Sequence, residues 1–241
     1  MKFNQIVYLF LTLMIMISSC KKNSEQTSTS SGGTSSMLIP LKTGNYWEFI
    51  DSSFNNGVFT YADTSRLTIT GTKHVSYQGK DYTVWFWSWN NQAQSPCWFV
   101  NNESDGLHFY GGKLDSVDYF LTKQLSYKFP VQAGETWKQV SVTYSGTKFY
   151  LGDTLPTHCL ATSYPFKTKA GVLSCIEFQY IRPAIKKNTI AGLQFTGIDQ
   201  GSSMATEVTL FYKPDMGYVG YIGKVNGLIT FTKTLSSCKL N

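Results

Sequence analysis

The sequence predicts an all-β protein with little helix, made of two related antiparallel curved sheets or half-open barrel lobes that derive from an internal duplication. Three observations predict this fold class. Apolar and polar residues alternate with a period of two along most of the chain, glycine-containing turns separate the alternating segments, and one short motif occurs twice. Antiparallel sheets with one face in a core show this alternation.

The repeated motif keeps proline, glycine and tryptophan at the same spacing in residues 40–47 and 130–137. Proline presets φ, glycine permits a tight reversal, and the tryptophan ring can anchor the strand that follows. The repeated positions are Pro40, Gly44, Trp47, Pro130, Gly134 and Trp137. The repeat predicts that each copy opens one half of the β body, with Trp47 and Trp137 as structural anchors in equivalent environments.

Later turns follow in the same order in both halves. Asn56-Gly57 and Ser145-Gly146 each predict a hairpin soon after the motif, and residues 105–107 are similar to residues 215–217. The spacing between the last two landmarks grows by about twenty residues, which predicts an insertion near 183–203. Chance recurrence of turn residues is the alternative explanation.

Individual strands are clearest in the second half. Residues 139–144, 176–180 and 229–232 alternate apolar and polar side chains, which is typical of half-buried strands. Asn226-Gly227 lies between two apolar segments and predicts a two-residue hairpin turn. No segment of the body has the period of an amphipathic helix.

The N-terminus predicts export. A short basic start is followed by an apolar run, Ile6 to Ile17, that is too short to span a bilayer comfortably and has the length of a signal-peptide core. Ile17-Ser18-Ser19-Cys20 then resembles the lipobox of bacterial lipoproteins. The resemblance implies that Cys20 receives a diacylglycerol and that its freed amine is acylated by a fatty acid such as palmitate. Ordinary secretion with cleavage after Ser19 is the alternative.

Residues 21–36 are rich in Ser, Thr and Gly and contain almost no apolar side chains, which predicts a flexible tether. Lys21-Lys22 and this tether resemble lipoproteins of the Bacteroidota. The resemblance implies a cell-envelope protein that is lipid-anchored to the outer membrane and is either periplasmic or surface-exposed. The predicted organisation is a signal peptide (1–19), the lipidated cysteine with its tether (20–36), a first β lobe (37–128) and a second β lobe (129–241).

Charge argues against one class of partner. The formal net charge is +6, but the lysines are spread along the chain and the body contains a single lysine pair, Lys186-Lys187. Nucleic-acid-binding domains concentrate positive charge in a patch or stripe. We therefore expect no nucleic acid partner, and the sequence does not indicate an oligomeric state.

Four cysteines remain if Cys20 is acylated, an even number in an oxidising compartment: Cys97, Cys159, Cys175 and Cys238. Cys159 and Cys175 flank the turn at Ala170-Gly171, which predicts a disulfide between neighbouring strands. Buried free thiols are the alternative. No Cys-x-x-Cys pair occurs, so the sequence predicts no metal ligands.

Catalytic motifs are not found. His74, His108 and His158 are the three imidazoles, and none stands in a nucleophile elbow, a metalloprotease helix or a phosphate loop. We expect no catalytic or cofactor-binding residues and no cofactor, and therefore no enzyme. Two carboxylates that meet in space would make a membrane-tethered secreted hydrolase, which is the alternative function.

The most distinctive chemical feature is the row Trp85, Trp87 and Trp89. Alternation places the three indoles on one face of a strand, in a row roughly 13 Å long. Such a row can stack on a sugar chain or an amphiphile, or it can fill the concave side of a curved sheet. The sequence therefore predicts a non-catalytic β body that binds a glycan, lipid or protein partner, with these indoles as ligand-binding candidates.

Overall fold

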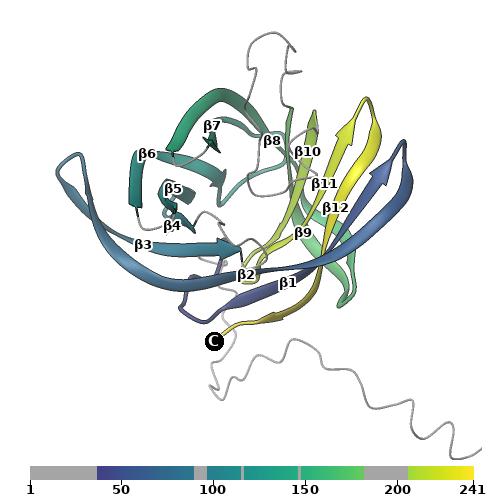
Figure 1. Cartoon of the computed structure of the whole chain (residues 1–241), viewed down its shortest axis with the longest axis horizontal. Coiled ribbons are helices and arrows are strands. Elements are labelled where there is room, and N and C mark those ends of the chain that lie inside the picture. Colours follow the sequence, from purple (N-terminus) through teal and green to yellow (C-terminus); the bar gives the residue numbers. More distant parts are fainter. Residues whose placement is uncertain (1–36, 90–96, 115–116, 146–147, 182–205) are drawn as a thin grey trace, which may run out of the picture.

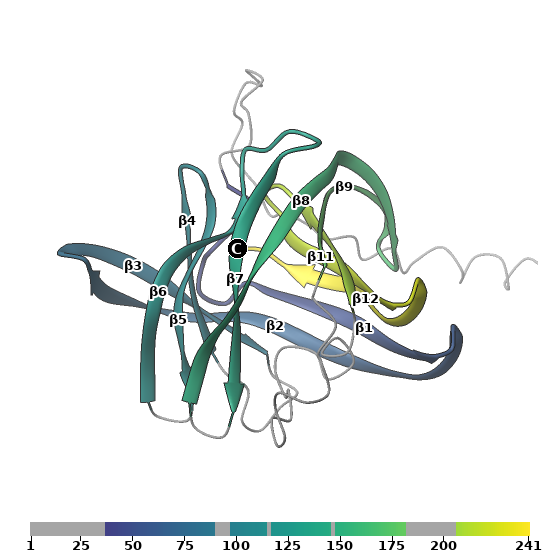
Figure 2. The ribbon, with the colours of Figure 1, turned by 90° about the horizontal axis from the view of Figure 1, so that it is seen from above.

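The computed structural model describes residues 37–89, 97–114, 117–145, 148–181 and 206–241. Within these ranges the chain forms twelve strands and no helix, which confirms the predicted all-β class. Each strand is antiparallel to its neighbours in one continuous sheet, which curves into a nearly closed barrel (Figures 1 and 2).

The first half contains six strands: β1 (Tyr46–Asn55), β2 (Val58–Tyr77), β3 (Lys80–Trp89), β4 (Cys97–Glu103), β5 (Gly106–Leu114) and β6 (Val117–Lys128). The second half contains β7 (Thr136–Ser145), β8 (Lys148–Thr168), β9 (Gly171–Ile181), β10 (Glu207–Lys213), β11 (Gly217–Val225) and β12 (Leu228–Lys239). Each half is a meander, and the strand order is β6-β5-β4-β3-β2-β1-β12-β11-β10-β9-β8-β7. The halves therefore meet through β1 and β12, and β6 and β7 are the two edges.

Strand positions in the two halves correspond. β1, β2 and β3 begin at residues 46, 58 and 80, and β7, β8 and β9 begin at 136, 148 and 171, an offset of 90 or 91 residues. β4, β5 and β6 begin at 97, 106 and 117, and β10, β11 and β12 begin at 207, 217 and 228, an offset of 110 or 111 residues. The offset grows between β9 and β10. The predicted insertion near 183–203 falls there, outside the described residues.

The two opening turns, which the repeated motif forms, make the same backbone hydrogen bonds. Gly44 N donates to Ile69 O and Gly134 N donates to Cys159 O, each at 2.8 Å. In return, Ile69 N and Cys159 N each donate to the carbonyl oxygen of the residue after that glycine, at 2.9 Å. Both glycines have φ of 88°, a conformation that favours glycine. The turns share one geometry, while the duplication of the sequence stays a prediction.

The tryptophans after these turns lie in different environments, so the prediction of equivalence is wrong on this point. Trp47 is fully buried and its Nε1 donates to Met216 O at 2.6 Å. Trp137 is half-buried, packs edge-on against Phe178, and donates from Nε1 to Ser126 O at 3.1 Å. The ring at the β1–β12 junction is therefore enclosed, and the ring beside β6 is not.

Two predicted hairpin turns are confirmed. Asn56-Gly57 joins β1 to β2, and Asn226-Gly227 joins β11 to β12. All four residues have positive φ, with 49° and 77° in the first turn and 51° and 78° in the second. Positive φ at both central residues defines a type I′ turn, whose twist matches that of the flanking strands.

The main core lies inside the curved sheet and draws on both halves. A smaller cluster of Val75, Val84, Phe99 and Tyr110 lies where the far part of the β2–β3 hairpin covers β4 and β5. The β8–β9 hairpin covers β10 to β12 in a similar way, because Phe166 stacks on Phe211 with 4.0 Å between ring centroids. Each half therefore folds its longest hairpin over the outside of its own sheet.

The predicted disulfide is wrong. The register of β8 and β9 places Cys159 opposite Phe178 and Cys175 opposite Tyr164. Both cysteines are fully buried free thiols. The β8–β9 ladder shifts register twice between these pairs, so the sulfurs do not face one another across the strands.

Candidate functional site

The tryptophan row turns toward the inside of the curved sheet. Trp89 is buried, with its ring centroid 5.6 Å from Phe49 and 6.3 Å from Tyr218. Trp85 and Trp87 are partly buried and pack against the same core. This is the arrangement of a core stripe. A ligand-binding role for the three indoles stays a prediction, and their packing does not favour it.

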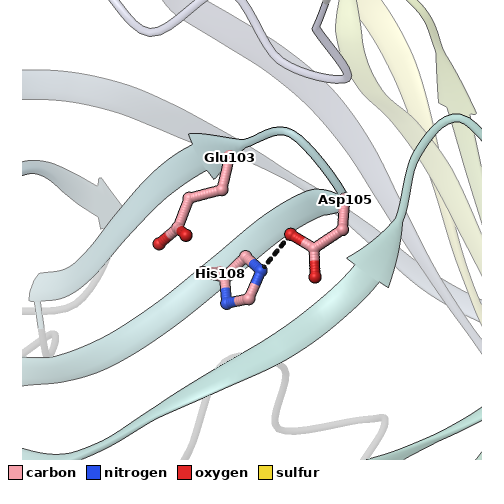
Figure 3. Close-up of side chains that lie close together, drawn as sticks. All are labelled: Glu103, Asp105 and His108. Atoms are coloured by element: carbon pink, nitrogen blue, oxygen red, sulfur yellow. Dashed lines mark hydrogen bonds and ion pairs between the residues drawn. The ribbon is translucent and has the colours of Figure 1, made fainter.

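A titratable cluster lies at the β4–β5 turn (Figure 3). Glu103 ends β4, Asp105 is in the turn, and His108 is on β5. One potential ligand atom from each residue lies within 4.8 Å of the other two. His108 Nε2 and Asp105 Oδ1 are 2.7 Å apart, and the imidazole is buried although the carboxylate is mostly exposed. No metal ligands were predicted from the sequence, and this cluster is the candidate the fold produces.

Contacts with the end of β6 fix the backbone of this turn. Gly106 has φ of 139°, and a Cβ atom there would lie 2.1 Å from Tyr127 O. Phe129 N donates to Asp105 O at 2.9 Å. Only glycine permits this close approach, so the end of β6 holds the turn and with it the position of the Asp105 side chain.

Both oxygens of Glu103 are already engaged. Oε1 accepts from the Tyr110 hydroxyl, and Oε2 accepts from Lys123 Nζ. Burial opposes ionisation of Glu103, but the hydrogen bonds from Lys123 and Tyr110 outweigh it and lower the pKa of the carboxyl. Burial and the Glu103 carboxylate together raise the pKa of Tyr110. Glu103 is therefore an anion at neutral pH whose charge is balanced by Lys123.

This arrangement is better suited to holding strands together than to binding a cation. A metal ion at Glu103, Asp105 and His108 would have to displace or face the Lys123 ammonium, which repels it. The contacts of Glu103 connect β4 to β5 through Tyr110 and to β6 through Lys123. The cluster thus joins three strands near the β6 edge.

The three histidines each have a different neighbour. His74 Nδ1 lies 3.2 Å from the Thr83 hydroxyl, and His158 Nδ1 lies 3.0 Å from the Thr136 hydroxyl. In each case the histidine and the threonine are directly opposite one another on neighbouring strands. His108 alone is buried, and its Nδ1 has no hydrogen-bond partner among the described residues. Its place between Leu107 and Phe109 in an unbroken apolar run is the sequence signal that indicates burial.

A buried ion pair crosses the β1–β12 junction. Lys233 Nζ donates to both carboxylate oxygens of Asp51 and to the Ser65 hydroxyl, each at 2.7 Å. The Lys233 side chain is 1% exposed and the Asp51 side chain 13% exposed. The ammonium also lies 4.5 Å from the centre of the Trp89 ring. Hydrogen bonds and the aromatic ring together compensate the buried charge.

Sequence reasoning missed this pair, although a signal for it exists. Asp51 has the same strand phase as the buried Phe49, and Lys233 has the same phase as the buried Phe231 and Leu235. A charged residue on the apolar phase of a strand indicates a buried partner of opposite charge. The pair stabilises the junction and does not form a reactive site, because the lysine is fully engaged.

The predicted lipid-attachment residue, Cys20, lies outside the described residues, as do the signal peptide and the tether. Its lipidation stays a prediction. In the part of the chain that the structure describes, no helix has the length and apolar character needed to cross a bilayer.

Over its described residues the chain is an all-β protein whose twelve strands form one barrel-like sheet. No protein-family model matches the sequence, and no curated protein matches it. A presumed exported protein with a YmcC-like fold from Bacteroides fragilis is 13% identical, with a TM-score of 0.42 over 85% of this chain and 99% of that one. A presumed lipoprotein from Parabacteroides distasonis is 11% identical, with a TM-score of 0.41 over 86% of this chain and 100% of that one. Similarities at this level carry no argument about function.

Proposed function

We propose that this chain is a lipoprotein of a bacterial cell envelope, anchored to the outer membrane through Cys20, whose non-catalytic β body binds a glycan, lipid or protein partner. The observation that carries the proposal is Cys20 itself. It stands directly after Ile17-Ser18-Ser19 and the apolar run that begins at Ile6. Lipid transfer in bacterial lipoproteins requires a cysteine at this place.

The anchor is strong enough to hold the protein. Each buried methylene contributes about 0.8 kcal/mol, and a single fatty chain gives only reversible binding. A diacylglycerol and an added acyl chain on Cys20 supply three chains. A chain modified in this way stays on the membrane without a transmembrane segment.

The contacts of two enclosed carboxylates, Glu103 and Asp51, argue against a catalytic role for either of them. Glu103 is neutralised by Lys123 and hydrogen-bonded by Tyr110, and Asp51 is held by Lys233. A general acid or base must be able to exchange a proton with a substrate. These carboxylates instead connect strands.

Substitution of Cys20 tests the proposal. Cys20→Ala should release the chain from membranes or leave an unprocessed precursor, because thioether formation requires the sulfur. Ser18→Ala is the matched control, since it keeps a small residue ahead of the cysteine and should leave processing unchanged. The measurement is membrane fractionation with separation of inner from outer membranes. A Cys20→Ala chain that is fully membrane-bound and normally processed would contradict the proposal.

A further inference from the structure

The β1–β2 hairpin ends in a group of exposed apolar side chains. Val58, Phe59 and Tyr61 are 69%, 57% and 55% exposed. Phe54 is half-buried and meets Phe59 edge-on, with 6.0 Å between ring centroids. The side chains flank the type I′ turn at Asn56-Gly57, so they belong to the outer part of a regular hairpin and not to an irregular loop.

A second turn adds to this surface. β1 pairs antiparallel with β12, and Ser53 is opposite Phe231, so the end of β1 and the start of β12 lie at the same end of the sheet. Figures 1 and 2 show the two hairpins side by side there. Leu228 is the first residue of β12 and is 49% exposed. We call Phe54, Val58, Phe59, Tyr61 and Leu228 the apolar hairpin end.

This surface carries no charge of its own. No Asp, Glu, Lys or Arg occurs from Ser52 to Ala62, and none occurs from Val225 to Thr232. Residues 82–102 and 154–166 also lack these four residue types, but their apolar side chains include buried core residues such as Trp89, Trp98 and Cys159. The Asp63 carboxylate lies at its border, because Asp63 Oδ2 accepts a hydrogen bond from the Tyr61 hydroxyl at 3.0 Å. Val58, Phe59 and Leu228 can therefore enter a medium of lower polarity without a charged side chain losing its water, while Tyr61 stays at the polar boundary.

We propose that the apolar hairpin end contacts the interfacial layer of the same membrane that holds the Cys20 lipid. The inference rests on the proposed function, because it takes the lipid anchor as given. Phe and Tyr rings suit the boundary between headgroups and acyl chains, and the Tyr61 hydroxyl donates to the Asp63 carboxylate on the polar side of that boundary. Val58 and Leu228 favour acyl chains over a glycan, since sugars stack on rings rather than on branched aliphatic side chains.

Chain length permits this contact. Met37 O accepts a hydrogen bond from Asp215 N, which holds the start of the described chain at the β10–β11 turn. That turn is at the other end of β11 from the β11–β12 turn. The ten residues of β1 span about 33 Å, which approximates the distance between the two ends of the sheet. Residues 21–36 can extend to about 50 Å, so a lipid on Cys20 and the apolar hairpin end can reach one bilayer.

An environment-sensitive probe on the lipidated full-length chain tests the proposal. Phe59→Cys is labelled with a nitrobenzoxadiazole fluorophore and reconstituted in vesicles of phosphatidylethanolamine and phosphatidylglycerol. Val172→Cys is the matched control, because Val172 is 66% exposed at the β8–β9 turn. The unsubstituted chain, treated with the same reagent, gives the background from native thiols. Circular dichroism confirms that each labelled chain is folded.

The probe at position 59 should emit at shorter wavelength than the probe at position 172 and should be quenched by nitroxide-labelled lipid. Aqueous iodide should quench it at least about threefold less, because the interface excludes the anion. Equal iodide quenching at both positions would overturn the proposal, because it would place the apolar hairpin end in water. Vesicle flotation distinguishes the two proposals. A chain that does not float with the vesicles contradicts lipid anchoring. A chain that floats but whose probe at position 59 is exposed to water contradicts only the membrane contact. Val58→Cys repeats the test at a second position.

Discussion

The two places where the halves meet are built differently. At the β1–β12 junction, eight residue pairs form a continuous antiparallel ladder with one register shift. The Asp51–Lys233 ion pair lies buried across it, and the fully buried Trp47 packs at one end. This junction is part of the main core and has the character of a protein interior.

The β6–β7 junction is where the barrel stays open. β6 and β7 are the two ends of the strand order, and no ladder joins them in the described residues. Trp137 Nε1 reaches Ser126 O, and Lys128 Nζ lies 3.1 Å from Glu135 Oε2 in a pair that is about one-third exposed. Side chains, rather than backbone pairing, hold this junction at one end.

The two opening turns share one backbone geometry, but the β1–β12 and β6–β7 junctions next to them are built differently. Asp51 and Lys233 are each the sixth residue of their strands, and the sixth residues of β7 and β6 are Ser141 and Thr122. An opening turn is fixed by its glycine and a few backbone bonds. A junction between strands depends on what is buried across it, and only one of the two positions holds an ion pair.

The largest expected effect concerns the ion pair. Asp51→Ala should lower the free energy of unfolding by about 3 to 5 kcal/mol, because it leaves the Lys233 ammonium buried without a counterion. Urea unfolding followed by circular dichroism measures this. The matched change at the other junction, Glu135→Gln, should leave the midpoint almost unchanged, since both side chains of that pair are about one-third exposed. Similar losses for both variants would contradict the distinction between the junctions.

The tryptophans sharpen the same comparison. Trp47→Ala should cost about 3 to 5 kcal/mol, because a fully enclosed ring leaves a cavity. Trp137→Ala should cost about half as much, since its ring keeps part of its surface in water. Both are measured by denaturant unfolding, with Trp47→Phe and Trp137→Phe as controls that keep an aromatic ring. Equal costs would show that the half-buried ring is as well packed as the enclosed one.

A smaller expected effect is a loss of stability at alkaline pH, and it comes from two buried cysteines that both lie in the second half. Burial raises the pKa of Cys159 and of Cys175 to about 11. Cys159 takes the place that Ile69 has in the first opening turn. Above pH 9 the unfolded chain releases these thiol protons while the folded chain retains them, so stability falls as pH rises from 9 to 11.

Each thiol should contribute a loss of about 1.4 kcal/mol between pH 8 and pH 10. Unfolding at a series of pH values measures the slope. Cys159→Ala and Cys175→Ala should each reduce the slope, although both lower stability at neutral pH. An unchanged slope in both variants would show that other groups cause the alkaline sensitivity.

The turns were predictable because they depend on local chemistry. Asn56-Gly57 and Asn226-Gly227 favour positive φ at two successive residues, and the structure has type I′ turns at both. Strand alternation likewise predicted the all-β class. These features require no knowledge of which strand lies beside which.

The partners in the buried ion pair at the β1–β12 junction could not be predicted in the same way, because they lie on strands far apart in sequence. Asp51 and Lys233 are 182 residues apart in sequence. The β2–β3 and β8–β9 hairpins cover the outside of the sheet, so a strand can be buried on both faces. The sequence alone then does not show which alternate residues of the strand face the inside. Trp89 lies on the inward phase and is part of the core, and two register shifts in the β8–β9 ladder separate Cys159 from Cys175, although these residues are near in sequence.

The most direct test of lipid anchoring is the mass of the N-terminal peptide from the membrane-bound protein. The peptide is expected to begin at Cys20 and to carry a diacylglycerol and an amide-linked fatty acid. A mature N-terminus at any other residue, or an unmodified Cys20 on protein that is nevertheless bound to membranes, would contradict the lipoprotein assignment.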